Sequence, residues 1–251
     1  MLVFASFRKT PAAFFCMTPS RHGALEVSDT DFGQQLTRVW DLPTRLFHWA
    51  LAIAVIGLIV TGTTGIMEWH FRLGYTVLAL LLFRLVWGFI GGRWSRFGAF
   101  LYAPGSVLAY LRRRAHPDHL IGHTPLGALS VFALLAILAL QVSTGLVADD
   151  EIAASGPLTR FVSGATVRLA SGWHKAQGKW IVIALVSLHV LAVLFYVLVK
   201  RHRLVRPMIS GDKLTADTVV PSRDVAATRV VALVVLMLCA GFAWWIASLR
   251  V

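Results

Sequence analysis

Five histidines lie within or at the edge of segments too apolar for a water-soluble surface: His48, His70, His123, His174 and His189. An imidazole inside a membrane is costly unless it pairs, carries protons or ligates a metal, so each marks a candidate functional site. His174 and His189 share one segment and are fifteen residues apart, or roughly 22 Å along a helix. They therefore lie near opposite faces of a hydrocarbon core about 30 Å thick. This spacing suits two metal centres, one in each leaflet.

The segments around these histidines identify an integral membrane protein. Of the 251 residues, 57% are hydrophobic and 14% are charged, and the mean hydropathy is +0.70. Five segments reach the ~20 residues that a spanning helix needs, at 45–66, 72–92, 125–147, 177–199 and 229–248. None shows the strict alternation of a barrel strand. The predicted fold class is therefore an all-α membrane protein.

The basic residues indicate the orientation of the chain in the membrane. The formal net charge is +12, and seventeen Lys and Arg residues fall in segments 1–45, 93–119 and 200–229, against six in the alternating loops. By the positive-inside rule, those three segments lie in the cytoplasm. The charge is thus explained by topology, and no nucleic-acid partner is expected. The N-terminus is expected to be cytoplasmic.

The cysteines and the N-terminal residues restrict the cofactor chemistry. Cys16 and Cys239 are far apart and no C-x-x-C-H motif is present, so a haem could not be attached covalently and would be held by histidine alone. Residues 1–38 are polar and irregular without a secretory signal, and are expected to form a disordered cytoplasmic lead-in; Met17 is a second candidate start. Because no nucleotide-binding motif occurs, the chemistry is expected inside the membrane.

Orientation assigns a depth to each histidine. The first span runs outward and the second and fourth run inward, so His48 and His189 are expected at the inner side and His70 and His174 at the outer side. Two such pairs are what six-coordinate b haems require, because the iron takes one imidazole from each face of the ring. His123 begins the third span at the inner side, where a second-shell or propionate-contacting role is favoured over ligation.

Two further features accompany the histidines. Arg84 lies in the inner half of the second span, where an unpaired guanidinium is expensive. A haem propionate is one natural partner, and snorkelling toward the cytoplasm is the alternative. Glycines follow three of the histidines four residues later, on the same helix face, at Gly74, Gly127 and Gly178. They either leave room for a porphyrin edge or mediate ordinary helix packing.

Several sequence stretches resemble the bacterial cytochrome b561 and nickel-hydrogenase b-type cytochrome family. The resemblance runs from about Val39 to Lys213, and is carried by VWDLPTRLFHW at 39–49, HFRLGY at 70–75, FRLVWGFIGGRWSRF at 83–97, GHTPLGAL at 122–129, WHKAQGKW at 173–180, LHVLAVL at 188–194 and RPMISGDK at 206–213. It implies a four-helix transmembrane bundle that binds two non-covalent b haems in the bacterial inner membrane. It also implies that the axial ligands are His48, His70, His174 and His189.

The resemblance suggests three parts of the chain: the lead-in at 1–38, a di-haem membrane domain at 39–213, and a linker with a fifth transmembrane helix at 214–251. It implies electron transfer across or within the membrane between a periplasmic redox partner, such as a c-type cytochrome or a hydrogenase, and the quinone pool. The alternative is a superoxide:quinone oxidoreductase-like enzyme acting on a small diffusible substrate, which calls for a positive outer surface. A haem-free transporter would need broken helices or inverted repeats, and neither is evident.

Overall fold

The computed structural model describes residues 34–112, 114, 121–152, 154–216 and 219–250, so residues 1–33 of the lead-in predicted at 1–38 lie outside the described residues. Within them, five helices are long and apolar enough to cross a membrane. These are α1 (Leu42–Thr64), α2 (Met67–Ile90), α4 (Pro125–Leu146), a continuous helix over Gly164–Val199, and α8 (Ala226–Ser248). The all-α membrane fold predicted from the sequence is confirmed.

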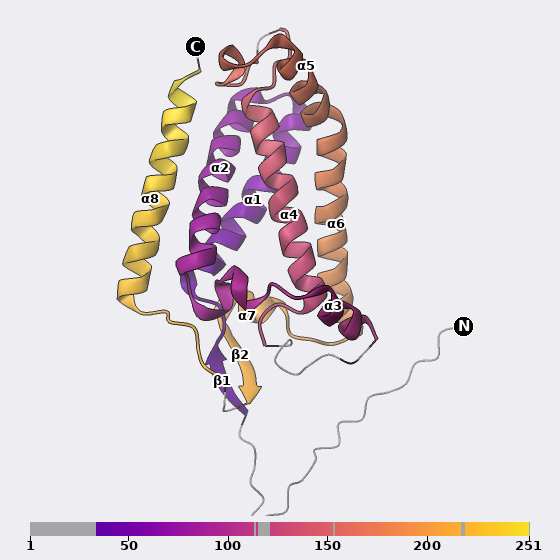
Figure 1. Ribbon diagram of the computed structural model, residues 1–251, viewed down its shortest axis with the longest axis vertical. Helices are drawn as coiled ribbons and strands as arrows, with labels where there is room; N and C mark the ends of the chain where they lie inside the picture. The colour runs from indigo at the N-terminus through magenta and orange to yellow at the C-terminus, as the bar shows by residue number, and fades with distance from the viewer. Residues whose placement is uncertain (1–33, 113, 115–120, 153, 217–218, 251) are drawn as a thin grey trace, which may run out of the picture. The chain divides into compact units, whose positions relative to one another are not determined.

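The spanning helices form a bundle of four with the fifth at its side. Helix α2 packs against α1 and α4, and α4 packs against α6 (Lys179–Leu194), the central part of the fourth span. Figure 1 shows α8, in yellow, running beside α2. Small side chains of α8, Ala232 and Cys239, are buried against Phe83 and Trp87 of α2. Small residues let two membrane helices approach closely, so α8 is a packed part of the bundle.

The hairpin between the first two spans is tighter than the apolar segments predicted. Helix α1 ends at Gly65, whose φ of 75° is in the left-handed region, and α2 already begins at Met67. The prediction that the second span starts at 72 was wrong, because hydropathy marks the apolar core of a helix and misses a polar first turn. His70 therefore lies in the first turn of α2 and not in a loop.

The fourth span also begins earlier than predicted. Helix α5 (Gly164–Gly172) continues without a break through a π-helical turn, η5 (Trp173–Gly178), into α6, and a second π-helical turn (Phe195–Val199) ends the span. The start predicted at 177 lies inside η5. Single π-helical turns in long helices are frequent at functional sites, and η5 carries His174.

The connecting segments contain short elements that the hydropathy pattern did not predict. Two 3₁₀ turns and α3 (Pro104–Leu111) precede α4, a further 3₁₀ turn precedes α5, and α7 (Val205–Ser210) follows the fourth span. Strands β1 (Gln34–Arg38) and β2 (Asp212–Ala216) pair antiparallel, with Thr37 opposite Lys213. The expectation of an irregular lead-in up to residue 38 missed β1.

A buried carboxylate connects the start of α1 to the end of α2. Asp41 is 1% exposed. Its Oδ1 accepts hydrogen bonds from the Thr44 amide at 2.8 Å and from the Trp87 indole at 3.3 Å. Its Oδ2 accepts from the Gly92 amide and the Ser95 hydroxyl, both at 2.9 Å. Four donors on one carboxylate offset its removal from water, and they hold the inner ends of α1 and α2 together.

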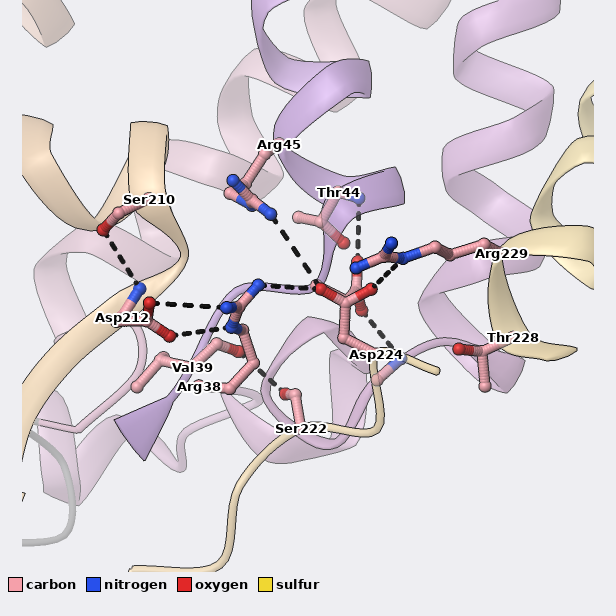
Figure 2. Close-up of polar contacts among 12 residues, drawn as sticks. Arg38, Val39, Thr44, Arg45, Ser210, Asp212, Ser222, Asp224, Thr228 and Arg229 are labelled. Carbon is pink, nitrogen blue, oxygen red and sulfur yellow. Dashed lines mark hydrogen bonds and ion pairs between the residues drawn. The ribbon is translucent and has the colours of Figure 1, made fainter. Parts of the chain in front are cut away.

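A second polar network joins the β-hairpin of β1 and β2 to α1 and α8. Figure 2 shows Arg38 between two carboxylates, with Nε 2.7 Å from Asp212 Oδ1 and Nη1 2.9 Å from Asp224 Oδ2. Asp224 also accepts from Arg229 Nε at 2.9 Å, and Arg45 lies at 3.9 Å. Burial alone would raise the pKa of Asp224, but the hydrogen bond from Arg229 and the charges of Arg229 and Arg38 lower it below its ordinary value. Asp224 is therefore ionised at neutral pH.

Candidate functional site

The two histidines predicted at the outer side face each other across one cavity. The ring centroids of His70 and His174 are 6.1 Å apart, and both rings line a cavity of about 370 Å³ between α1, α2, α4 and the fourth span. An imidazole nitrogen lies about 2 Å from a bound metal and about 1 Å from its own ring centroid, so two opposed rings on one iron have centroids roughly 6 Å apart. The observed spacing fits a bis-histidine centre.

Hydrogen bonding on the far side of the His70 ring determines which of its nitrogens carries the proton. Thr61 Oγ1 donates its only proton to the Gly57 carbonyl at 2.7 Å and lies 3.3 Å from His70 Nδ1. The Thr61 hydroxyl must therefore accept from His70. With Nδ1 protonated, Nε2 keeps the lone pair that a metal needs.

His174 is held in the same way by a main-chain carbonyl. Its Nδ1 lies 2.9 Å from the carbonyl oxygen of Gln141, which can only accept, so Nδ1 carries the proton here as well. The side chain of Gln141 returns a hydrogen bond from Nε2 to the His174 carbonyl, also at 2.9 Å. This two-way contact attaches the π-helical turn η5 to α4 and leaves His174 Nε2 free for a ligand bond.

Two glycines make room for these rings. A Cβ atom on Gly62 would lie 3.0 Å from His70 Cε1, and one on Gly145 would lie 2.7 Å from His174 Cε1. The second distance is shorter than any real Cβ contact, so a larger residue at 145 would displace the imidazole. Glycine at these two positions allows each histidine to lie at a helix interface.

The glycines predicted from the spacing behave differently from one another. Gly74 lines the cavity, and a Cβ there would meet nothing within 4 Å, which suits the edge of a large planar group. Gly127 lies beside Thr124 at the start of α4, and Gly178 packs against Gln141. Gly127 therefore belongs to the N-terminal cap of α4, and Gly178 to the packing of two helices. Helix packing was the alternative to a contact with a porphyrin edge.

The inner pair, His48 of α1 and His189 of α6, lies close enough for the two rings to interact electrostatically. The His48 ring meets Trp49 edge-on, with centroids 5.1 Å apart. Its Nδ1 is buried without a hydrogen-bond partner among the described residues. A buried imidazole with an unsatisfied nitrogen requires a partner that protein atoms do not supply, which suits a bound cofactor.

His123 lies beside this inner pair in an aromatic environment. Its ring centroid is 4.6 Å from that of Trp40 and 4.4 Å from that of Phe100. Burial lowers the pKa of His123 to about 3, and the charges of Arg84, His48 and Lys213 act in the same direction. His123 is therefore neutral at neutral pH and can donate or accept a hydrogen bond without adding charge.

Arg84 is buried rather than extended toward the cytoplasm. It is 4% exposed, and its Cζ lies 4.6 Å from the ring centroid of Phe97 and 6.0 Å from that of Phe100. The Arg84 side chain therefore does not snorkel toward the cytoplasm, which was the alternative. Nη1 of Arg84 is buried and has no hydrogen-bond partner among the described residues.

The donor set around both pairs suits haem better than a compact metal cluster. Among the described residues, no group of three or more His, Cys, Asp or Glu side chains gathers at one point. Each pair offers two imidazoles, which is what a haem iron with two axial ligands requires, and the cavity of the outer pair is lined mainly by apolar side chains. Among the described residues, one groove is lined by side chains of both signs of charge, Asp149, Glu151, Arg160 and Arg168, and this groove is not the positive surface that the superoxide alternative calls for.

Several residues of the site were missed by sequence reasoning. Thr61 and Gln141 act through hydrogen bonds to histidines that lie 9 and 33 residues away. Polar residues inside an apolar span are the one signal that could have found them, since such residues are rarely without a partner in a membrane. Gly62 directly follows Thr61, and Gly145 lies one turn after Gln141 on the same helix face, but the roles of both glycines depend on the packing of those helices.

Comparison with known proteins places this architecture in a family. The model of the prokaryotic cytochrome b561 family matches residues 39–211. The chain belongs to this family. It is a multi-pass membrane cytochrome that binds b-type haem and carries electrons. The matched residues end before Asp224 and α8.

Curated relatives of this cytochrome come from several bacteria. A probable Ni/Fe-hydrogenase B-type cytochrome subunit of Azotobacter chroococcum mcd 1 is 27% identical over 238 residues, covering 77% of this chain and 98% of the relative. A protein of the same description from Cupriavidus necator is 26% identical, covering 72% and 88%. A probable Ni/Fe-hydrogenase 1 B-type cytochrome subunit of Escherichia coli K12 is 24% identical, covering 69% and 88%. No solved structure matches the chain at a significant level.

The hydrogen bond from His70 to Thr61 generates a prediction. Thr61→Val removes the acceptor, so His70 Nδ1 loses a partner and the ring its orientation, and the dissociation constant of the haem at this pair should rise about 10- to 100-fold. Thr63→Val is the matched control, because the Thr63 hydroxyl bonds only carbonyls of its own helix, those of Ile59 and Val60. Haem titration into the extracted apoprotein in detergent measures both variants. Equal affinities in the two would contradict the role assigned to Thr61.

Proposed function

We propose that this protein is a di-haem b-type cytochrome that transfers electrons across or within the bacterial cytoplasmic membrane, between a periplasmic redox partner and the quinone pool. The observation that carries the proposal is the outer histidine pair, whose rings are 6.1 Å apart and whose Nδ1 atoms both face hydrogen-bond acceptors. A pair of imidazoles with free Nε2 atoms at this spacing is organised for one iron between them.

The proposal assigns His70 and His174 to the outer haem and His48 and His189 to the inner one. Bound haem supplies reversible one-electron chemistry at its iron. The chain supplies the rest: it presents the axial nitrogens, excludes water from the bundle and sets the charge around each site. His174 of η5 and His189 of α6 are about four helical turns apart, and one turn rises 5.4 Å, so this separation supports two sites in different leaflets.

At the inner site we assign Arg84 and His123 to the surroundings of the haem and not to its iron. Arg84 is a buried cation with an unsatisfied Nη1, which suits a propionate carboxylate. His123 is neutral and its Nδ1 is also buried without a partner among the described residues. A neutral imidazole there can donate one hydrogen bond to a carboxylate or to the distal nitrogen of a ligand.

The outer end is the proposed docking side for a periplasmic partner. The relatives' names describe cytochrome subunits of hydrogenases, so the proposed partner is a hydrogenase-like protein or a c-type cytochrome. The cavity of the outer pair extends to the loop residues Asp149 and Asp150 and to Lys175. The site therefore reaches the loop that connects α4 to α5. The basic segments of the chain support a cytoplasmic N-terminus and hence a periplasmic position for this end.

Alanine variants of the four histidines test the pairing. His70→Ala and His174→Ala should each lose the same redox centre, while His48→Ala and His189→Ala lose the other, because each haem needs both of its axial ligands. His202→Ala is the control, since His202 lies in a loop after the fourth span and contacts Tyr196. Redox titration followed by optical spectra distinguishes the centres. Loss of a common centre in His70→Ala and His189→Ala would show that the pairing is wrong.

A stopped-flow experiment tests the direction of access. A soluble reduced donor such as a c-type cytochrome, added from the periplasmic side, should reduce the outer centre first, and the observed rate should fall as salt rises, because exposed charges are screened beyond about 8 Å at physiological ionic strength. The His174→Ala variant, which retains the inner centre, is the comparison. Equally fast reduction of the inner centre in that variant would contradict a relay that begins at the outer side.

A further inference from the structure

Two buried polar atoms of opposite kind lie next to the outer histidine His174. One is the indole Nε1 of Trp173, which can only donate a hydrogen bond, and the other is the side-chain Oε1 of Gln141, which can only accept one. Both atoms are buried, and neither has a hydrogen-bond partner among the described residues. Buried polar atoms are nearly always bonded to protein or to ordered water, so this donor and this acceptor require a partner.

Gly178 brings the two atoms to one place. Nε1 of Trp173 and Oε1 of Gln141 both lie within 2.8 Å of the position that a Cβ atom on residue 178 would take. They are therefore at most twice that distance apart, yet they do not bond each other directly. Trp173 is the first residue of η5 and Gly178 the last, and a π-helical turn brings residues five apart next to each other. The Gln141 side chain reaches the same point from α4.

We propose that one water molecule binds between Trp173 and Gln141 beside Gly178, where it accepts from the indole and donates to the amide oxygen. Hydrogen bonds are about 2.8 to 3.0 Å long, so one water can bridge a donor and an acceptor up to about 5.6 Å apart. The site offers the two polar partners that a buried water needs. Gln141 also lines the outer cavity, which extends to the loop after α4.

The surroundings hold the indole in place. Trp173 packs against a buried cluster formed by Val55, Ile137, Leu138 and Val182, which come from α1, α4 and α6. These contacts are all apolar, so they fix the ring without giving its N–H a partner. Replacing Trp173 by phenylalanine therefore removes the N–H and keeps an aromatic ring in the same cluster.

The water keeps Gln141 in contact with His174. Nε2 of the Gln141 amide donates to the His174 carbonyl at 2.9 Å, so the amide oxygen must point away from that carbonyl. If this buried oxygen had no donor, its burial would be costly and would favour a side chain turned away from His174. Because the Gln141 carbonyl also accepts from His174 Nδ1 at 2.9 Å, Trp173 is a positioning residue that acts on His174 through the water and Gln141. Its effect on a haem rests on the proposed outer haem.

Ultraviolet resonance Raman spectra of the purified protein test the water site itself, because one tryptophan band moves when the indole N–H is hydrogen-bonded. The difference between wild type and Trp173→Phe should show a hydrogen-bonded Trp173. Gly178→Ala should convert this signal to that of a free N–H, because the added Cβ takes the space of the water. Gly172→Ala is the matched control, since a Cβ on Gly172 would meet nothing within 4 Å. A free indole N–H in the wild type would overturn the proposal.

Infrared spectra in isotope-labelled water distinguish a bridging water from a direct bond between the two side chains. The difference between wild type and Trp173→Phe should contain an O–H band of one bound water, and this band should move when the water is labelled at oxygen. A difference spectrum without such a band would overturn the proposal, because the indole would then bond Gln141 directly.

The outer haem supplies the functional readout. Trp173→Phe should raise the dissociation constant of this haem about tenfold, the lower end of the effect of residues that orient a ligand, and should change its low-spin electron paramagnetic resonance signal, which depends on the orientation of the imidazole planes. The inner haem should be unchanged. Trp180→Phe is the matched control, because Trp180 lies on the same span and is 64% exposed.

Equal outer-haem affinities and signals in wild type and Trp173→Phe would overturn the positioning role. If Trp173→Phe does not fold, Gly178→Ala against Gly172→Ala gives the same comparison. A wild type that shows the hydrogen-bonded indole and the water band but lacks an outer haem would refute the proposed function and leave the water site standing.

Discussion

The protonation of His70 and His174 at Nδ1 is the constraint on which the arrangement of the outer site depends. An imidazole can ligate a metal only through a nitrogen that has lost its proton, and in an apolar bundle the position of that proton is set by the nearest acceptor. Thr61 supplies the acceptor for one ring and the Gln141 carbonyl for the other. Without these contacts the two rings could still be close, but nothing would keep both Nε2 lone pairs available.

The rest of the outer site follows from that requirement. Each acceptor is on a helix adjacent to the histidine that it serves, so α1 must pack on α2 and α4 must pack on the fourth span. Close packing requires glycine where each ring meets its neighbour, at Gly62 and Gly145. His174 lies in the π-helical turn η5, and its main-chain carbonyl accepts a hydrogen bond from the Gln141 side chain. The π-helical turn η5 and the orientation of the His174 ring thus depend on the same contacts with Gln141.

The inner end is organised by charges rather than by main-chain acceptors. Asp41 joins the ends of α1 and α2, and Asp224 joins the β-hairpin, α1 and α8. A buried charge without a partner is costly, and among the described residues at this end Nη1 of Arg84 and Nε of Arg45 are buried without a hydrogen-bond partner. The two ends therefore differ: hydrogen-bond acceptors orient the histidines at the outer end, and ion pairs and buried charges organise the inner end.

The sequence was sufficient for the five spans and the all-helical fold, because hydropathy and length dominate the choice of structure in a bilayer. It could not provide the true starts of α2 and the fourth span, since α2 begins with a polar first turn and the fourth span begins with the weakly apolar α5 and η5. Strand β1 was missed because its partner is more than 170 residues away and five residues of ordinary composition carry no local signal. Thr61 and Gln141 were missed because each acts on a residue of another element.

The most direct test is the haem content of the purified protein. Pyridine haemochrome analysis against protein concentration should give two b haems for each chain, and acid-acetone extraction should remove all of the haem, because only histidine nitrogens and carboxylate contacts would hold it. A ratio near one, or haem that remains with the protein after extraction, would contradict the account of two bis-histidine sites.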